Sequence, residues 1–306
     1  MAETESIAAL SRSGAHRVLQ PARYGGLAGS ADEFVSAVCE LAVRDGSLGW
    51  LAMTFNAAAH ELAALPEPVL DEVWGADPEA LIATTFRGSG ELGPNDALTG
   101  RWESVVGAEH AQWLLLPADD GGPVRVLVPC SAARLEPPGA GRRGLGAAGI
   151  CDVEVAAVEV DERHVFSHRD GPAVIAVRGA AAAVVGSADG VWRKHVAQVR
   201  ARLATSSGGD EVSDAAAAQV AWAASDIDAA RVQVTSPLEA AGDLAAAIWV
   251  HRQAVARARD AADRLLANSR HALDASDPVT LAWEDVQAGC RMAAQLVDGL
   301  ESAAIR

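Results

Sequence analysis

Two clusters of aromatic, polar and glycine residues are the strongest candidates for chemistry in this sequence. The first, residues 45–50, contains two glycines that allow a helix to begin tightly and a tryptophan, Trp50, that would project inward. The second cluster comprises three short segments: 84–90, 100–102 and 107–110. Glycine lets the backbone approach a flat ligand closely, and tryptophan can stack on one. The clusters therefore indicate a site for a planar molecule, although a core tryptophan beside a helix cap is the alternative interpretation of Trp50.

Sequence motifs that define other common chemistries are not present. The chain has no GxxxxGK[ST] phosphate loop, no GxSxG nucleophile motif, no HExxH zinc motif and no GxGxxG that opens a helix after a strand. For the closest histidine pair, His164 and His168, we expect a surface position rather than a metal site. The four cysteines form no CxxC pair and are expected to be reduced, buried thiols. We therefore predict neither a metal centre nor a disulfide framework.

The acidic composition excludes two classes of partner. The 306 residues include 25 Lys and Arg against 41 Asp and Glu, so the formal net charge is −16. No net positive field attracts the phosphates of a nucleic acid or an anionic membrane surface. No run of eighteen uncharged apolar residues predicts a membrane span, and the first ten residues carry Glu3 and Glu5 where a signal peptide needs positive charge. We expect a cytoplasmic protein.

The elements that must position these clusters fall into three zones of different periodicity. Residues 1–79 favour helices, because Ser30 and Glu33 form a capping box ahead of an apolar face. Further helices are predicted over 47–65 and 68–74, both delimited by prolines. The first zone is therefore expected to be an N-terminal helical domain.

Residues 80–178 favour short strands instead. Apolar runs at 113–116 and 124–128 flank the turn sequence at 119–122, which is a hairpin signal. Valine and glutamate alternate over 153–160, as in strands with one exposed face. We predict a central antiparallel β-domain here.

Residues 179–306 return to the helical period. Apolar residues recur on one face from Leu244 to Leu266 and again from Leu281 to Leu300. A second capping box, SPLE, begins at Ser236. The four predicted helices cover 181–204, 213–235, 237–272 and 278–303. The complete prediction is an α+β fold whose third part is a C-terminal four-helix bundle.

Four segments carry a family resemblance, in a consistent order along the chain. They are PARYGGL (21–27), RDGSLGW (44–50), GRW followed by GAEHAQW (100–113), and GLGAAGICDVEV (144–155). Together they resemble the acyl-CoA dehydrogenase superfamily, and within it the two-component monooxygenases that use reduced flavin. The resemblance covers about residues 20–303 and implies the same three-part order, with flavin bound between the β-domain and the bundle.

The resemblance also implies a reaction and a set of site residues. A partner flavin reductase would supply reduced FMN or FAD, and oxygen would be transferred to an aromatic or polyketide-like small molecule. Trp50 and His110 would face the substrate, and His110 is the candidate catalytic residue. The implied cofactor-binding residues are Phe86, Ser89, Trp102 and Val106. Homo-oligomers or hetero-oligomers formed through the helical bundle are implied as well.

Some family features are replaced in this chain. Relatives usually carry Ser-Gly where this chain has Val106-Gly107, and Thr-Gly-Ser where it has Ala-Gly-Ile at 148–150. Flavin polar groups left unpaired by these changes would cost about 1–3 kcal/mol each, so we expect weaker flavin binding. The chain is also expected to be shorter at both ends, lacking a helix before residue 21 and the family's C-terminal histidine base.

Three functions remain open at this point. The first is a reduced-flavin-dependent monooxygenase. The second is a flavin-free derivative of the fold that catalyses a non-redox step such as cyclisation. The third is a non-catalytic subunit that pairs with a full-length paralogue. An acyl-CoA dehydrogenase proper is not favoured, because no glutamate stands in a motif that marks an α-proton-abstracting base.

Overall fold

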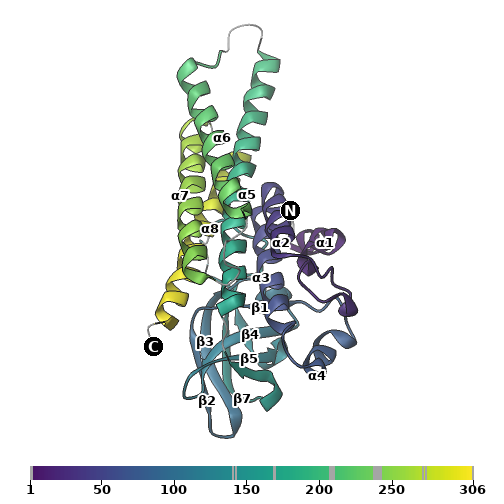
Figure 1. The fold of residues 1–306 in the computed structure, drawn as a ribbon. Helices are drawn as coiled ribbons and strands as arrows, with labels where there is room; N and C mark the ends of the chain where they lie inside the picture. Colours follow the sequence, from purple (N-terminus) through teal and green to yellow (C-terminus); the bar gives the residue numbers. More distant parts are fainter. Residues whose placement is uncertain are drawn as a thin grey trace.

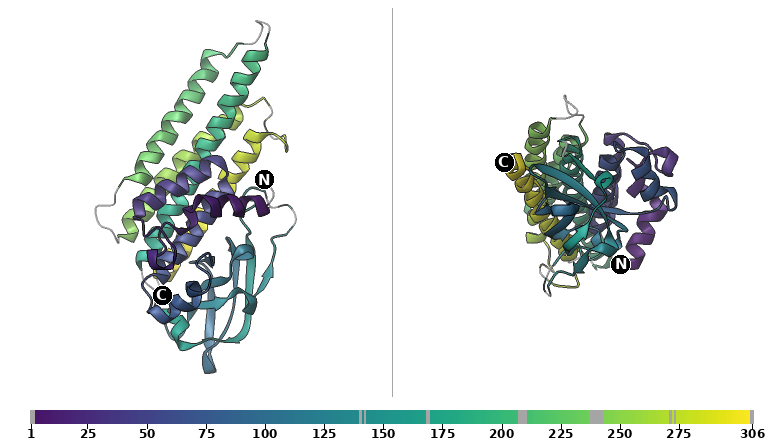
Figure 2. Two further views of the ribbon diagram at one scale, coloured as in Figure 1. Left: turned by 90° about the vertical axis from the view of Figure 1, so that its right-hand side faces the viewer. Right: turned by 90° about the horizontal axis from the view of Figure 1, so that it is seen from below.

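The N-terminal helices and the C-terminal helical bundle both lie over one end of a β-sheet (Figure 1). The computed structural model describes residues 3–139, 141, 143–167, 170–206, 211–236, 243–270, 272 and 274–304. Figure 2 shows the N-terminal helices lying along the bundle, and α2 and α3 both contact α5. The three-part order predicted from the sequence is therefore confirmed.

The N-terminal part contains α1 (Glu3–Ser13), α2 (Ala31–Arg44), α3 (Gly46–Leu62) and α4 (Glu67–Leu70). The predicted capping box is present, because the Glu33 amide donates to the Ser30 hydroxyl at 3.2 Å and the Ser30 amide donates to the Glu33 carboxylate at 2.7 Å. Helix α1 was not expected before residue 21. Its stability comes from tertiary packing, since Leu10 is buried in the helical core although the helix has few apolar residues.

The sheet contains eight strands. They are β1 (Ile82–Thr84), β2 (Ser89–Gly93), β3 (Ala97–Val105), β4 (Trp113–Asp119), β5 (Pro123–Pro129), β6 (Arg134–Glu136), β7 (Cys151–Glu159) and β8 (Val165–Ser167). Their order is β6-β7-β3-β2-β4-β5-β8, with β1 paired to β4. The predicted β4–β5 hairpin is confirmed. The sheet is mostly antiparallel, as predicted, and β1 and β2 each pair with β4 in parallel.

The two strands predicted over 153–160 form one continuous strand, β7. Ala157 within it has a φ of 52°, and the pairing of β3 with β7 shifts register between Leu98 and Gly100. The extra residue bends the strand without ending it.

The bundle consists of α5 (Asp170–Thr205), α6 (Asp214–Thr235), α7 (Leu244–Ala267) and α8 (Pro278–Ala304). Helix α5 begins at Asp170, before the predicted boundary at 179. The SPLE capping box lies largely outside the described residues, and the Asp243 side chain caps α7 by accepting from the Ala246 amide at 2.9 Å. Leu281, assigned to the apolar face of α8, is exposed instead.

Helix α5 forms the centre of the helical core. A window within Gly171–Thr205 is long and apolar enough to cross a membrane, with a mean hydropathy of 1.5, yet 94% of it is buried inside the protein. Gly186 illustrates the close packing, since a Cβ there would lie 2.3 Å from the Cys39 carbonyl oxygen of α2. This helix is therefore a core helix of the fold.

Candidate functional site

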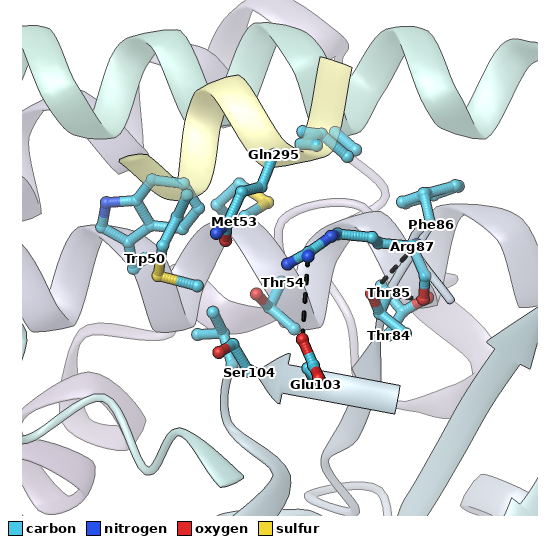
Figure 3. Close-up of a pocket in the computed structure, with 14 residues that line it drawn as sticks. Trp50, Met53, Thr54, Thr84, Thr85, Phe86, Arg87, Glu103, Ser104 and Gln295 are labelled. Carbon is cyan, nitrogen blue, oxygen red and sulfur yellow. Dashed lines mark hydrogen bonds and ion pairs between the residues drawn. The ribbon is translucent and has the colours of Figure 1, made fainter. Parts of the chain in front are cut away.

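A pocket of about 60 Å³, partly open to solvent, lies where the sheet meets the helices (Figure 3). Its walls come from α3, the segment after β1, the end of β3, α5 and α8. The lining residues are Trp50, Met53, Thr54, Thr84, Thr85, Phe86, Arg87, Glu103, Ser104, Val106, Ala176, Met292, Gln295 and Leu296. Sites for small organic molecules enclose about 300–1,000 Å³, so a ring-sized ligand would enter this pocket only when lining side chains move.

Trp50 reaches the pocket because α3 begins tightly against its neighbours. The Asp45 side chain caps the helix by accepting from the Ser47 amide at 2.8 Å. A Cβ at Gly49 would lie 2.5 Å from the Cβ of Ala42, so only glycine allows α2 and α3 to pack this closely. The Trp50 side chain is buried, and its Nε1 has no hydrogen-bond partner among the described residues.

The segment Thr84–Arg87 is fixed by a buried arginine. Arg125 of β5 donates to the carbonyl oxygen of Thr85 at 2.7 Å and to the hydroxyl of Thr84 at 2.6 Å. Glu61 of α3 balances its charge through two hydrogen bonds of 2.8 and 3.1 Å. The guanidinium carbon also lies 4.8 Å from the centre of the Phe86 ring. Phe86 therefore has a defined position in the pocket wall.

Ser104 supplies a hydroxyl that sequence reasoning missed. The pairing of β3 with β7 shifts register between Trp102 and Val105, and Ser104 adopts a left-handed φ of 56°. The Asp152 carboxylate accepts from the Ser104 amide at 2.9 Å and supports this conformation. A β-bulge re-aims side chains, and here Ser104 and Val106 both line the pocket.

His110 lies beyond the pocket wall. After Val106 the chain turns at Gly107, which has a φ of 75°, and the His110 ring comes to rest against Gly149. His110 is half-buried, and its Nε2 has no hydrogen-bond partner among the described residues. The structure thus places His110 near the site but outside the lining of this pocket.

The two segments in which family hydroxyls are replaced lie side by side. The Gly107 amide donates to the Ala148 carbonyl oxygen at 2.9 Å. Val106, Ala148 and Ile150 are buried in the same apolar cluster. Of these aliphatic side chains, Val106 lines the pocket, whereas Ala148 and Ile150 are not part of its lining.

Two of the implied cofactor residues occupy other places. Trp102 is fully buried in the interior of the sheet, where its indole packs against Gly90 and Gly100 and its Nε1 donates to the Pro117 carbonyl oxygen at 3.0 Å. It lies outside the pocket lining because inward-facing positions of β3 fill the sheet core. Ser89 is exposed and lines a neighbouring cavity of about 380 Å³, which shares Phe86 and Arg87 with the pocket.

A buried carboxylate anchors the loop that precedes β7. Asp285 of α8 accepts from the Leu145 amide at 2.6 Å. Burial raises its pKa to about 6, the Leu145 hydrogen bond opposes this shift, and the charge of Asp45 adds to it. The loop, α3 and α8 are thereby joined behind Trp50.

The histidine and cysteine expectations have different outcomes. His164 is buried rather than on the surface, and its Nε2 lies 3.1 Å from Glu72 Oε2, whereas His168 lies outside the described residues.

The four cysteines form no disulfide, and burial raises the pKa of Cys290 to about 12. Within the described part of the chain, no three His, Cys, Asp or Glu side chains are grouped so that they could hold a metal ion.

The pocket combines apolar walls with a few polar groups. Phe86, Val106, Met53 and Leu296 provide flat or aliphatic surface. Polar groups come from Thr54, Arg87, Ser104 and Gln295, of which only Arg87 lies in a segment, 84–90, that the sequence indicates as a candidate. Such a lining suits a planar ligand with one apolar and one polar end, which describes a flavin ring or an aromatic substrate.

Comparisons with known proteins point in one direction. No protein-family model matches the chain. It is 28% identical over 327 residues to the flavin-dependent monooxygenase oxygenase subunit HsaA of Rhodococcus jostii, covering 93% of this chain and 86% of that protein. Over 140 residues it is 34% identical to the oxygenase component of an FADH2-dependent resorcinol hydroxylase of Rhizobium sp., covering 42% of this chain and 34% of that one.

Solved structures give the same result. The 3-HSA hydroxylase of Rhodococcus sp. RHA1 superposes with a TM-score of 0.85 at 26% identity, covering 98% of this chain and 87% of that one. XiaF of Streptomyces sp., solved with FADH2 and glycerol, superposes with a TM-score of 0.80 at 22% identity, covering 98% and 86%.

The chain therefore has the acyl-CoA dehydrogenase-like fold, as the resemblance implied. Its homologues include the oxygenase subunits or components of flavin-dependent monooxygenases and hydroxylases.

Proposed function

We propose that this chain is the oxygenase component of a two-component monooxygenase, which uses reduced FMN or FAD from a separate reductase to hydroxylate an aromatic or polyketide-like small molecule. The observation that carries the proposal is the similarity to HsaA over 93% of the chain, combined with a pocket at the junction of sheet and bundle. The relatives include a resorcinol hydroxylase and a p-hydroxyphenylacetate 3-hydroxylase, so an aromatic ring is the preferred substrate class.

The chemistry of the lining fits a flavin, and its side chains would have to move to enlarge the pocket of about 60 Å³. Trp50, a lining residue, has a buried Nε1 with no partner among the described residues, and such groups in native proteins call for a ligand or water. Phe86 and Val106 on the sheet side and Met53 on the helical side would hold the ring, with Ser104 as a hydroxyl partner. When bound, reduced flavin supplies the electrons for oxygen activation.

The chain's own residues perform the remaining tasks. Trp50, Met53 and Leu296 would cover a bound ligand from the helical side and shield the reacting groups from water. His110 is our candidate for holding or accepting the substrate proton, supported by its unpaired Nε2 and its position four residues beyond Val106.

Anaerobic titration with FMNH2 and FADH2, followed by tryptophan fluorescence, tests the cofactor assignment. We expect micromolar binding of at least one reduced flavin. Leu296→Trp fills the pocket and should weaken that binding at least tenfold, whereas Leu281→Trp, on the exposed face of the same helix, should not. Absence of binding by both flavins would support a flavin-free function instead.

The assembly and location of the protein complete the proposal. We infer that the bundle forms oligomers, because Trp222, Val232 and Trp249 expose apolar side chains on α6 and α7. Light scattering of the purified protein tests this inference, and a measured mass equal to that of a single chain would contradict it. The four free thiols support a reducing, cytoplasmic location.

A further inference from the structure

Arg87 is a weakly paired cation that lines the pocket. Its nearest acidic partner among the described residues is Glu103, and the ion-pair distance of 3.8 Å is too long for a hydrogen bond. Figure 3 shows its side chain extending across the pocket towards Thr54 and Glu103. Five guanidinium donors therefore lie beside a cavity whose other surfaces are mostly apolar.

The backbone of Arg87 is held firmly, although its side chain is 37% exposed. The Arg87 amide donates to the Thr85 hydroxyl at 3.1 Å, and Arg125 fixes Thr85 in turn. On the other side, a Cβ at Gly299 of α8 would lie 3.4 Å from the Cα of Arg87. The guanidinium is thus presented to the pocket from a fixed point.

Glu103 does not satisfy this cation fully. Its side chain is 63% exposed, so water solvates the carboxylate and an exposed pair of this kind contributes little. A ligand carboxylate inside the pocket could replace it and accept two parallel hydrogen bonds, which is the geometry that arginine favours.

We propose that Arg87 selects substrates that combine an aromatic ring with a carboxylate, the carboxylate displacing Glu103. The substrate ring would lie against Met292 and Leu296 of α8, apart from the residues assigned to the flavin, while the anionic group pairs with the guanidinium. This inference rests on the proposed function, because it takes the ligand of the pocket to be the substrate of the monooxygenase. It explains how a protein with a net charge of −16 admits an anion, because the cation acts at short range.

Calorimetric titration of matched acids and amides tests the proposal. The probes are 4-hydroxyphenylacetate against 4-hydroxyphenylacetamide and indole-3-acetate against indole-3-acetamide, each with flavin-free and with FMN-saturated protein. At least one acid should bind about tenfold more tightly than its amide. Arg87→Gln should abolish this preference, and Glu103→Gln should strengthen acid binding a few-fold by removing the competing carboxylate.

Arg101→Gln is the matched control. Arg101 lies on β3 with Glu103, but it pairs with Glu136 and Asp152 at 3.1 Å and is not part of the pocket lining. This variant should keep the full preference for acids.

Four outcomes would overturn the proposal: equal affinity for acid and amide, no binding of any probe, a preference that survives in Arg87→Gln, or an Arg87→Gln defect confined to FMN binding. The last would assign Arg87 to the cofactor phosphate. Failure of the proposed function gives a different result from failure of this inference. In that case the acids would still bind, but the protein would bind no reduced flavin.

Discussion

Ser104 and Val106 show how a single backbone irregularity determines what the pocket presents. The resemblance implies that Val106 replaces a serine of the relatives, which removes one hydroxyl. The structure places the Val106 side chain in the pocket lining. The positive φ of Ser104 brings another hydroxyl into the same lining. A strained residue of this kind costs about 1–3 kcal/mol and persists where its surroundings determine it, here through Asp152.

His110 gives the prediction at the residue scale. If it holds the substrate proton, His110→Gln should lower kcat by about 100-fold or more, because general base catalysis contributes at least that much. Binding of reduced flavin should be unchanged, and the pH–rate profile should lose one limb. Rapid-reaction kinetics on the variant would contradict the role if kcat stayed within twofold of wild type.

Whether a site residue can be predicted from the sequence depends on how far along the chain its neighbours in the pocket lie. Trp50, Phe86 and Val106 line the pocket where the resemblance placed a site, although their roles stay predictions. Arg87 lies in the candidate segment 84–90 but has no role predicted from the sequence, and Gln295 is not predicted at all, because both reach the pocket only when α8 packs against the segment after β1. Trp102 was misplaced, since a sequence pattern does not tell which face of a strand fills the sheet core.

At the scale of elements, Asp285 connects α8 to the loop before β7. Its pKa of about 6 in the folded protein exceeds the value of 3.8 for an ordinary aspartate. The folded state therefore binds the proton more tightly, and the free energy of unfolding falls as the pH rises from about 4 to about 6. Above pH 6 the stabilising contribution of the neutral acid is lost.

Asp285→Asn should remove this dependence while keeping an oxygen that accepts from the Leu145 amide. The variant should be more stable than wild type by about 1–3 kcal/mol at pH 7.5, with little difference at pH 4. Urea unfolding at both pH values measures this. A variant that is less stable at pH 7.5 would show that the carboxylate charge stabilises the loop.

Elements with strong local signals were predictable. The capping box at Ser30 and the β4–β5 hairpin form as the residues indicate. The early start of α5 at Asp170 was not predictable, because buried helices carry no polar face to give a period. The parallel pairing of β1 with β4 also has no local signal, since it joins segments about 30 residues apart.

At the scale of the whole molecule, the fold creates the site. Among the described residues, one apolar core joins the N-terminal helices and the bundle, a second fills the sheet, and a third lies around Trp74; the apolar lining of the pocket belongs to the first or packs against it. Of the segments with the family resemblance, 44–50 and 100–113 contribute residues to the pocket lining, whereas Tyr24 of segment 21–27 packs in the third core. The order of helices, sheet and bundle could be predicted from the sequence, whereas the cavity depends on how the two cores meet.

The central claim is that the protein transfers one atom of molecular oxygen to an organic substrate with electrons from reduced flavin. The most direct measurement supplies FADH2 or FMNH2 through a free reductase under ¹⁸O₂ and analyses the product from 4-hydroxyphenylacetate or resorcinol by mass spectrometry. The account predicts one ¹⁸O atom per product molecule and no product without the reductase. Conversion of substrate without oxygen or flavin, or a product that lacks the label, would contradict it.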